Sequence, residues 1–229
     1  MLEMVMLRDM VADKTPLSEY DARLVEAMAL YGRTREELAD LRNSGKLPGD
    51  LQFLLLAATQ TAPPETVLPL LAEIRSSLYL LPAVAGKPLL VIGGLAGLAE
   101  WTLARELAEA GGQIAADLLC TSGRRIDEHD HTDDISRIEA LAVEYFNRLP
   151  CLPVEPNGRF YHAVENIIGD HGIRGVIFLQ PGNCAAYTAE EERLRWHINM
   201  PVLTVGRKLL EMAPERRIAT FSRFIAGLD

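Results

Sequence analysis

Apolar side chains recur every three or four residues through most of the N-terminal third of the chain, which is the spacing of amphipathic helices. The repeat is interrupted at Asn43-Ser44-Gly45 and at Pro63-Pro64, two segments typical of helix breaks. The expected helices cover residues 17–31, 34–41, 50–58 and 65–78. We interpret residues 1–84 as a helical arm or cap.

After Ala85-Gly86-Lys87-Pro88 the pattern changes to short apolar runs that alternate with amphipathic segments, as in βαβ units. The expected strands cover residues 89–92, 113–118, 175–179 and 201–205, with a weaker candidate at 151–154. The expected helices cover residues 98–110, 134–147, 160–170, 189–197 and 215–226. We therefore predict that residues 85–229 form a Rossmann-like α/β domain with a doubly wound parallel sheet.

Two short patterns predict where helices of this domain end and begin. Gly111-Gly112 favours the end of a helix, because glycine adopts the left-handed conformation that closes many helices. Thr188 and Glu191 form a Thr-x-x-Glu capping box, which predicts that the helix over residues 189–197 begins there.

Composition and charge narrow the class of protein. The chain has 229 residues, of which 48% are hydrophobic, enough for one main core. Its formal net charge of −9 argues against a nucleic-acid partner, because binding a phosphate backbone needs a basic face. The N-terminus lacks the apolar core of a signal peptide, and no apolar run is long enough to span a membrane. We expect a cytoplasmic protein that binds neither nucleic acid nor membrane.

A glycine-rich turn is the first candidate for a ligand site. Gly93, Gly94 and Gly97 follow a predicted strand and precede a predicted helix, where backbone N–H groups can face a phosphate. They are our candidate cofactor-binding residues. The spacing is not GxGxxG, and Asp117 is the one acidic residue near the end of the next strand, so a simple tight turn is the alternative.

Metal ligands and nucleophiles give weaker signals. Residues 124–134 contain carboxylates and imidazoles that could in principle hold a divalent cation, although a solvated loop before a helix is the better explanation. Cys120, Cys151 and Cys184 are too widely spaced for a zinc motif, and a small buried side chain is the simplest interpretation of each. The sequence contains no nucleophile elbow, Walker loop or zinc-peptidase motif.

Several segments, read in order, resemble a known family. They are SEYDARLVEAMALYGRTREELADL, LLVIGGLAG, AGGQIAADLLCTSGRR, VEYFNRLPCLPV, GIRGVIFLQPGNCAAY and MPVLTV. Together they resemble the C-terminal portion of a subunit of the 2-hydroxyacyl-CoA dehydratase and benzoyl-CoA reductase family, which includes the 2-hydroxyglutaryl-CoA dehydratase D-component.

The resemblance implies an anaerobic iron–sulfur lyase or oxidoreductase acting on a CoA thioester. In this family a 4Fe-4S cluster is held by cysteines from two domains, and an ATP-dependent activator protein supplies an electron. Cys184 matches one of those cysteines, and it is our candidate metal ligand. One thiolate cannot hold such a cluster, so the resemblance implies a homo- or hetero-oligomer with a longer family member that completes the site.

Three functions follow as hypotheses. The first is a dehydratase or reductase component that is inactive alone. The second is a non-catalytic scaffold or assembly subunit derived from the family, because Ala185 and Gly206 stand where the family has acidic residues. The third is an unrelated small-molecule-binding module.

Overall fold

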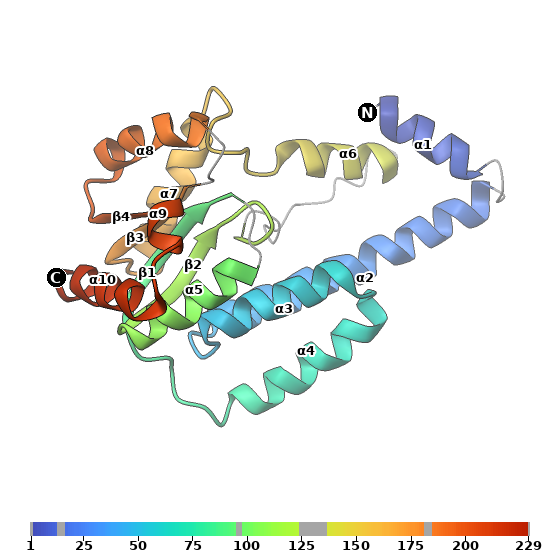
Figure 1. Cartoon of the computed structure of the whole chain (residues 1–229). Coiled ribbons are helices and arrows are strands. Elements are labelled where there is room, and N and C mark those ends of the chain that lie inside the picture. Colours follow the sequence, from blue (N-terminus) through green and yellow to red (C-terminus); the bar gives the residue numbers. More distant parts are fainter. Residues whose placement is uncertain (1, 13–16, 95–97, 124–136, 181–184, 229) are drawn as a thin grey trace.

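The computed structural model describes residues 2–12, 17–94, 98–123, 137–180 and 185–228. Its centre is one sheet of parallel strands in the order β2-β1-β3-β4 (Figure 1). The strands are β1 (Lys87–Gly93), β2 (Gly112–Leu118), β3 (Gly175–Leu179) and β4 (Val202–Val205). The helices are α1 (Leu2–Ala12), α2 (Leu17–Asn43), α3 (Gly49–Thr61), α4 (Pro64–Leu78), α5 (Leu98–Glu109), α6 (Arg137–Asn147), α7 (Gly158–Asp170), α8 (Ala185–Ile198), α9 (Arg207–Leu210) and α10 (Pro214–Ala226).

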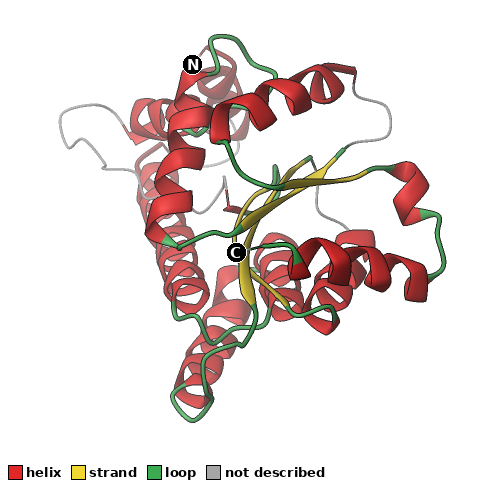
Figure 2. Cartoon of the chain, turned by 90° about the vertical axis from the view of Figure 1, so that its left-hand side faces the viewer, coloured by secondary structure: helices red, strands yellow, loops and turns green. Residues whose placement is uncertain are grey.

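Helices cover both faces of the sheet (Figure 2). Alternate residues of β1 point to opposite faces, so Leu90 and Ile92 join one apolar cluster while Leu89 and Val91 join the other. The first cluster includes side chains from α7 and α8, and the second includes side chains from α3, α5 and α10. Burial on both faces explains why β3 and the centre of β1 are continuous apolar runs rather than alternating ones. The predicted Rossmann-like fold is confirmed.

The four stronger strand predictions are confirmed with small differences at their ends, but the weaker one is wrong. Residues 151–154 form a turn, in which the Val154 N–H donates to the Cys151 carbonyl at 2.9 Å. Pro150 and Pro153 explain the error, because proline has no N–H to donate to a neighbouring strand.

The helix predictions needed two corrections. Residues 17–31 and 34–41 belong to one helix, α2, which continues through Gly32; the Thr34 hydroxyl donates within it to the Leu30 carbonyl at 2.8 Å. A glycine inside a helix costs about 1 kcal/mol, too little to end a helix whose next turns bury Thr34 and Leu38.

The predicted capping box is also wrong. Helix α8 begins at Ala185, so Thr188 lies within its first turn rather than before it. The Thr188 hydroxyl accepts a hydrogen bond from Gln180 at 2.7 Å, and the Glu191 carboxylate pairs with Arg195 at 2.9 Å. The two side chains therefore bind other groups. By contrast, Gly111 closes α5 as predicted, with a left-handed φ of 91°.

The helices before β1 have an apolar cluster of their own and a second attachment to the sheet. Leucines of α2, α3 and α4 form that cluster, which includes Leu38, Leu56 and Leu71. Phe53 of α3 instead enters the cluster on the sheet, and the Gln52 amide donates to the Ile114 carbonyl of β2 at 3.2 Å. Helix α3 thus holds this part of the chain against β2 and α5. In the described part of the chain, no helix is long and apolar enough to cross a membrane.

Phe53→Ala is expected to lower the free energy of unfolding by about 3–5 kcal/mol, because the lost phenyl ring leaves a cavity between α3 and the sheet. Phe53 is 7% exposed, whereas the next residue, Leu54, is 54% exposed. Leu54→Ala is the matched control, with an expected change of about 0.5 kcal/mol or less. Urea denaturation measures both, and equal losses would show that Phe53 does not anchor α3.

Candidate functional site

The carboxyl ends of the four strands meet at one edge of the sheet, where open α/β sheets bind their ligands. Gly93 ends β1, Leu118 ends β2, and Gln180 and Gly206 directly follow β3 and β4. We call this group, together with residues 119–123, the carboxyl edge. It contains the first half of the predicted glycine turn.

Gly93 and Gly94 are the described glycines of this turn, and the carbonyl group of each accepts a hydrogen bond. The Gly93 carbonyl accepts a hydrogen bond from the Tyr187 hydroxyl at 3.0 Å, and the Gly94 carbonyl accepts one from the Cys120 N–H at 2.8 Å. A Cβ atom on Gly93 would lie 2.7 Å from the Leu179 side chain, so packing alone requires glycine there. Of our other candidate residues, Gly97 and Cys184 lie outside the described residues.

Two cysteines lie close to the glycine turn. Cys120 contacts it through its backbone, and the Cys151 sulfur lies 3.5 Å from the Tyr187 hydroxyl that binds Gly93. Both cysteines are half-buried, and neither is in a disulfide. The fold therefore brings two cysteines that are 31 positions apart in the sequence to the same turn.

Asp117 organises the loop after β2. Its carboxylate forms an ion pair with Arg42 of α2, and the two side chains are 1% and 9% exposed. The same carboxylate accepts hydrogen bonds from the Ser122 hydroxyl at 2.6 Å and from the N–H groups of Leu119 and Gly123, each at 3.0 Å. Gly123 passes so close that a Cβ atom would lie 1.8 Å from the Asp117 carbonyl oxygen. Because the carboxylate is buried and bound within the chain, it does not face a nucleotide ribose.

Glu190 of α8 is, like Asp117, a buried carboxylate that holds the neighbouring segments in place. Its buried carboxylate accepts hydrogen bonds from the Tyr161 hydroxyl at 2.7 Å and the Asn157 amide at 2.9 Å, and it pairs with Arg193 at 2.8 Å. Burial raises the pKa of the Tyr161 hydroxyl, and the hydrogen bond to the Glu190 carboxylate raises it further. The cluster ties α7, α8 and the turn before α7 together, which fixes the helix that carries Tyr187.

A resident metal cluster does not fit the described residues by themselves. Among them, no three side chains of His, Cys, Asp or Glu converge as metal ligands. The acidic stretch at residues 124–134 lies outside the described residues, as does Cys184. We therefore derive no reaction step through an iron–sulfur cluster.

Sequence reasoning missed the residues that organise this edge. Asp117 was considered only as a possible ribose ligand, and its partner Arg42 carries no local signal because it lies 75 positions away. Glu190 lies on α8 next to Glu191, the residue that was misread as part of a capping box. An acidic residue on a buried apolar strand, as at Asp117, is the one signal that could have indicated a buried partner.

The chain was compared with known proteins. A family model described as 2-hydroxyglutaryl-CoA dehydratase, D-component, matches residues 3–218. The match begins in α1 and ends within α10, so it spans both the N-terminal helices and the sheet. No curated protein matches the chain.

Asp117→Ala is expected to cost about 3–5 kcal/mol in the free energy of unfolding, because it leaves the buried Arg42 guanidinium without its partner. Asp40→Ala is the control: Asp40 also pairs with an arginine, Arg75, but is 68% exposed, so the expected cost is below about 1 kcal/mol. Chemical denaturation measures the two losses. Similar values would contradict the role given to Asp117.

Tyr161→Phe is expected to reduce the loss of stability at alkaline pH. The folded-state pKa of Tyr161 is raised above its unfolded value of about 10, so this stabilisation is complete below about pH 10 and declines as the pH rises further. Unfolding free energies at about pH 8 and pH 11 measure the change. Between these two pH values the free energy of unfolding should fall less in Tyr161→Phe than in the wild type. Tyr79→Phe, at an exposed position, should show the same fall as the wild type. A parallel decline in the Tyr161 variant would contradict the assignment.

Proposed function

We propose that this chain is one component of a 2-hydroxyacyl-CoA dehydratase-type enzyme and that it shares the catalytic cluster with a partner. The chain belongs to the 2-hydroxyglutaryl-CoA dehydratase D-component family. The single observation that carries the proposal is the family match over residues 3–218. It also sets aside the hypothesis of an unrelated binding module. The proposed substrate is a CoA thioester, and the proposed outcome is dehydration or a related reduction.

The proposed site is the carboxyl edge, with Cys184 as its iron ligand. By sequence, Cys184 stands between β3 and α8, and Tyr187 of α8 binds the Gly93 carbonyl. A 4Fe-4S cluster normally needs three or four protein thiolates, and no three candidate ligands converge among the residues that the structure describes. We propose that a longer family member supplies the others, either in the same oligomer or as a second subunit, and that an ATP-dependent activator delivers the electron.

The chain's own part in such an enzyme is to hold the edge in place. Gly93 and Gly94 give a narrow turn whose carbonyls are already bound, while Gly97 extends the turn toward α5 in sequence. We propose that the N–H groups of this turn face the phosphates of the substrate, as at other strand-to-helix turns. The buried groups around Asp117 and Glu190 keep the loops after β2 and before α7 in position.

A second candidate function is a non-catalytic assembly subunit. Ala185 and Gly206, which stand where the family has acidic residues, favour it. This alternative predicts a stable complex with a longer family member in which the present chain contributes no iron ligand.

Iron binding by the assembled complex tests the proposal. Anaerobically purified complex with wild-type chain is expected to contain iron and to show the broad absorbance of an iron–sulfur cluster. Cys184→Ser is expected to abolish the iron that the shared site holds, because serine does not replace a thiolate ligand. Cys120→Ser and Cys151→Ser are the matched controls, and both should retain it.

Each outcome separates the two functions. Loss of iron only in the Cys184 variant supports the shared cluster. Full iron in the Cys184 variant, or a wild-type complex without iron, would overturn the ligand assignment and leave the assembly role. Size-exclusion chromatography of every variant checks that the complex itself still forms.

A further inference from the structure

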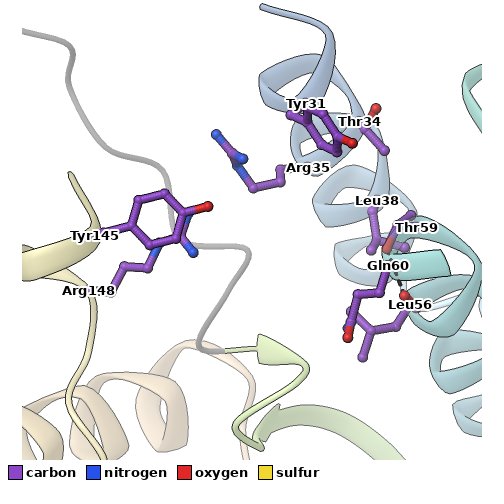
Figure 3. Close-up of a pocket in the computed structure, with 9 residues that line it drawn as sticks. All are labelled: Tyr31, Thr34, Arg35, Leu38, Leu56, Thr59, Gln60, Tyr145 and Arg148. Carbon is purple, nitrogen blue, oxygen red and sulfur yellow. Dashed lines mark hydrogen bonds between the residues drawn. The ribbon is translucent and has the colours of Figure 1, made fainter. Parts of the chain in front are cut away.

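A pocket of about 210 Å³ lies between α2, α3 and α6, apart from the glycine turn (Figure 3). Its residues are Tyr31, Thr34, Arg35, Leu38, Leu56, Thr59, Gln60, Tyr145 and Arg148. Figure 3 shows Arg35 reaching from α2 toward Tyr145 of α6 and toward Arg148, the residue that directly follows α6. Helices that are distant in the sequence thus bring two guanidinium groups and two phenols to one cavity.

The pocket has one positive charge in excess among its described ion pairs. Both arginines pair with a single carboxylate, that of Glu144, at 2.8 Å for Arg148 and 3.4 Å for Arg35. Glu144 is 4% exposed, and the pairs use its Oε1 atom while Oε2 is buried without a hydrogen-bond partner in the described structure. Among the described residues, two guanidinium groups thus share one carboxylate, which leaves one positive charge for an anion to neutralise.

The two arginines differ in how firmly they are held. Arg148 forms the shorter contact to Glu144, and its guanidinium also lies 4.0 Å from the centre of the Tyr145 ring. Arg35 has the longer contact and is the more exposed of the two. Arg35 is therefore the group best placed to bind an incoming ligand without breaking the buried pair beneath it.

We propose that this pocket binds a small oxyanion, a carboxylate or a phosphate, through Arg35 and Arg148. Arginine matches the paired oxygens of both groups, and a bound anion would neutralise the excess charge. The hydroxyl hydrogens of Thr34 and Thr59 are donated to helix carbonyls at 2.8 and 2.7 Å, so further donors to the ligand come from the tyrosines. This inference does not depend on the proposed function.

The size of the pocket and its lining limit the ligand. A volume of about 210 Å³ is below the ~300–1,000 Å³ of sites for drug-sized molecules, so the ligand is a short acid or a single phosphate group. Leu38 and Leu56 provide an apolar wall beside the charged groups. A carboxylate with a small apolar body would use both parts of the pocket.

Isothermal titration calorimetry of the full chain at low chloride tests the proposal, with inorganic phosphate, acetate and benzoate as probes. Wild-type protein is expected to bind at least one of them, and Arg35→Gln is expected to weaken that binding at least about tenfold, because it removes the excess charge. Arg33→Gln is the matched control, since it removes the same charge from an exposed position of α2. It should change the affinity less than about twofold.

A variant of opposite sign strengthens the test. Glu144→Gln removes the competing carboxylate and is expected to tighten anion binding several-fold, while circular dichroism confirms that each variant is folded. Tighter binding of phosphate than of either acid would assign a phosphate site, and tighter binding of benzoate than of acetate would assign a carboxylate site with an apolar wall. No binding of any probe at millimolar concentration, or equal weakening by Arg33→Gln and Arg35→Gln, would overturn the proposal.

Discussion

The buried ion pair between Arg42 and Asp117 is the contact on which the arrangement of this protein depends. It joins the C-terminal end of α2 to the end of β2, and it is the centre from which the loop after β2 is built. That loop in turn provides the N–H of Cys120 to the glycine turn, and the carbonyl of Thr121 to Gln60 of α3. A buried pair adds little net stability over apolar packing, but it penalises every arrangement in which one partner lacks the other. The pair therefore fixes position more than it adds stability.

Features of the fold that depend on residues close together in the sequence could be predicted, and features that depend on distant residues could not. The strands of the sheet were predictable because burial on both faces makes each of them a short apolar run bounded by turn residues. The wrong strand at residues 151–154 is also apolar, and only Pro150 before it and Pro153 within it distinguish it. Neither the pair between Arg42 and Asp117 nor the pocket around Arg35 could be predicted, because each joins segments that are far apart in the sequence. Hydrophobic periodicity reports which face of an element is buried, not which polar group it meets there.

The carboxyl edge and the anion pocket are neighbours through α3. Gln60 lines the pocket and also donates a hydrogen bond to the Thr121 carbonyl in the loop after β2. A ligand that displaces α3 would also displace the loop after β2, and a change in that loop would alter the pocket. In a multi-subunit enzyme of this family, such a connection would let the state of one site influence the other by ordinary thermodynamic linkage.

The two outer strands of the sheet each have an outward-facing carbonyl already bound by a side chain. Gln52 of α3 binds Ile114 on β2, and Arg195 of α8 binds Val202 on β4 at 2.7 Å. A strand from another molecule could pair with either edge only by displacing these groups. Partner subunits are therefore expected to dock on helices and loops, so that two sheets remain separate within any complex. Continuous sheets that run from one subunit into the next, and the fibres that such edges can nucleate, are disfavoured by the same two side chains.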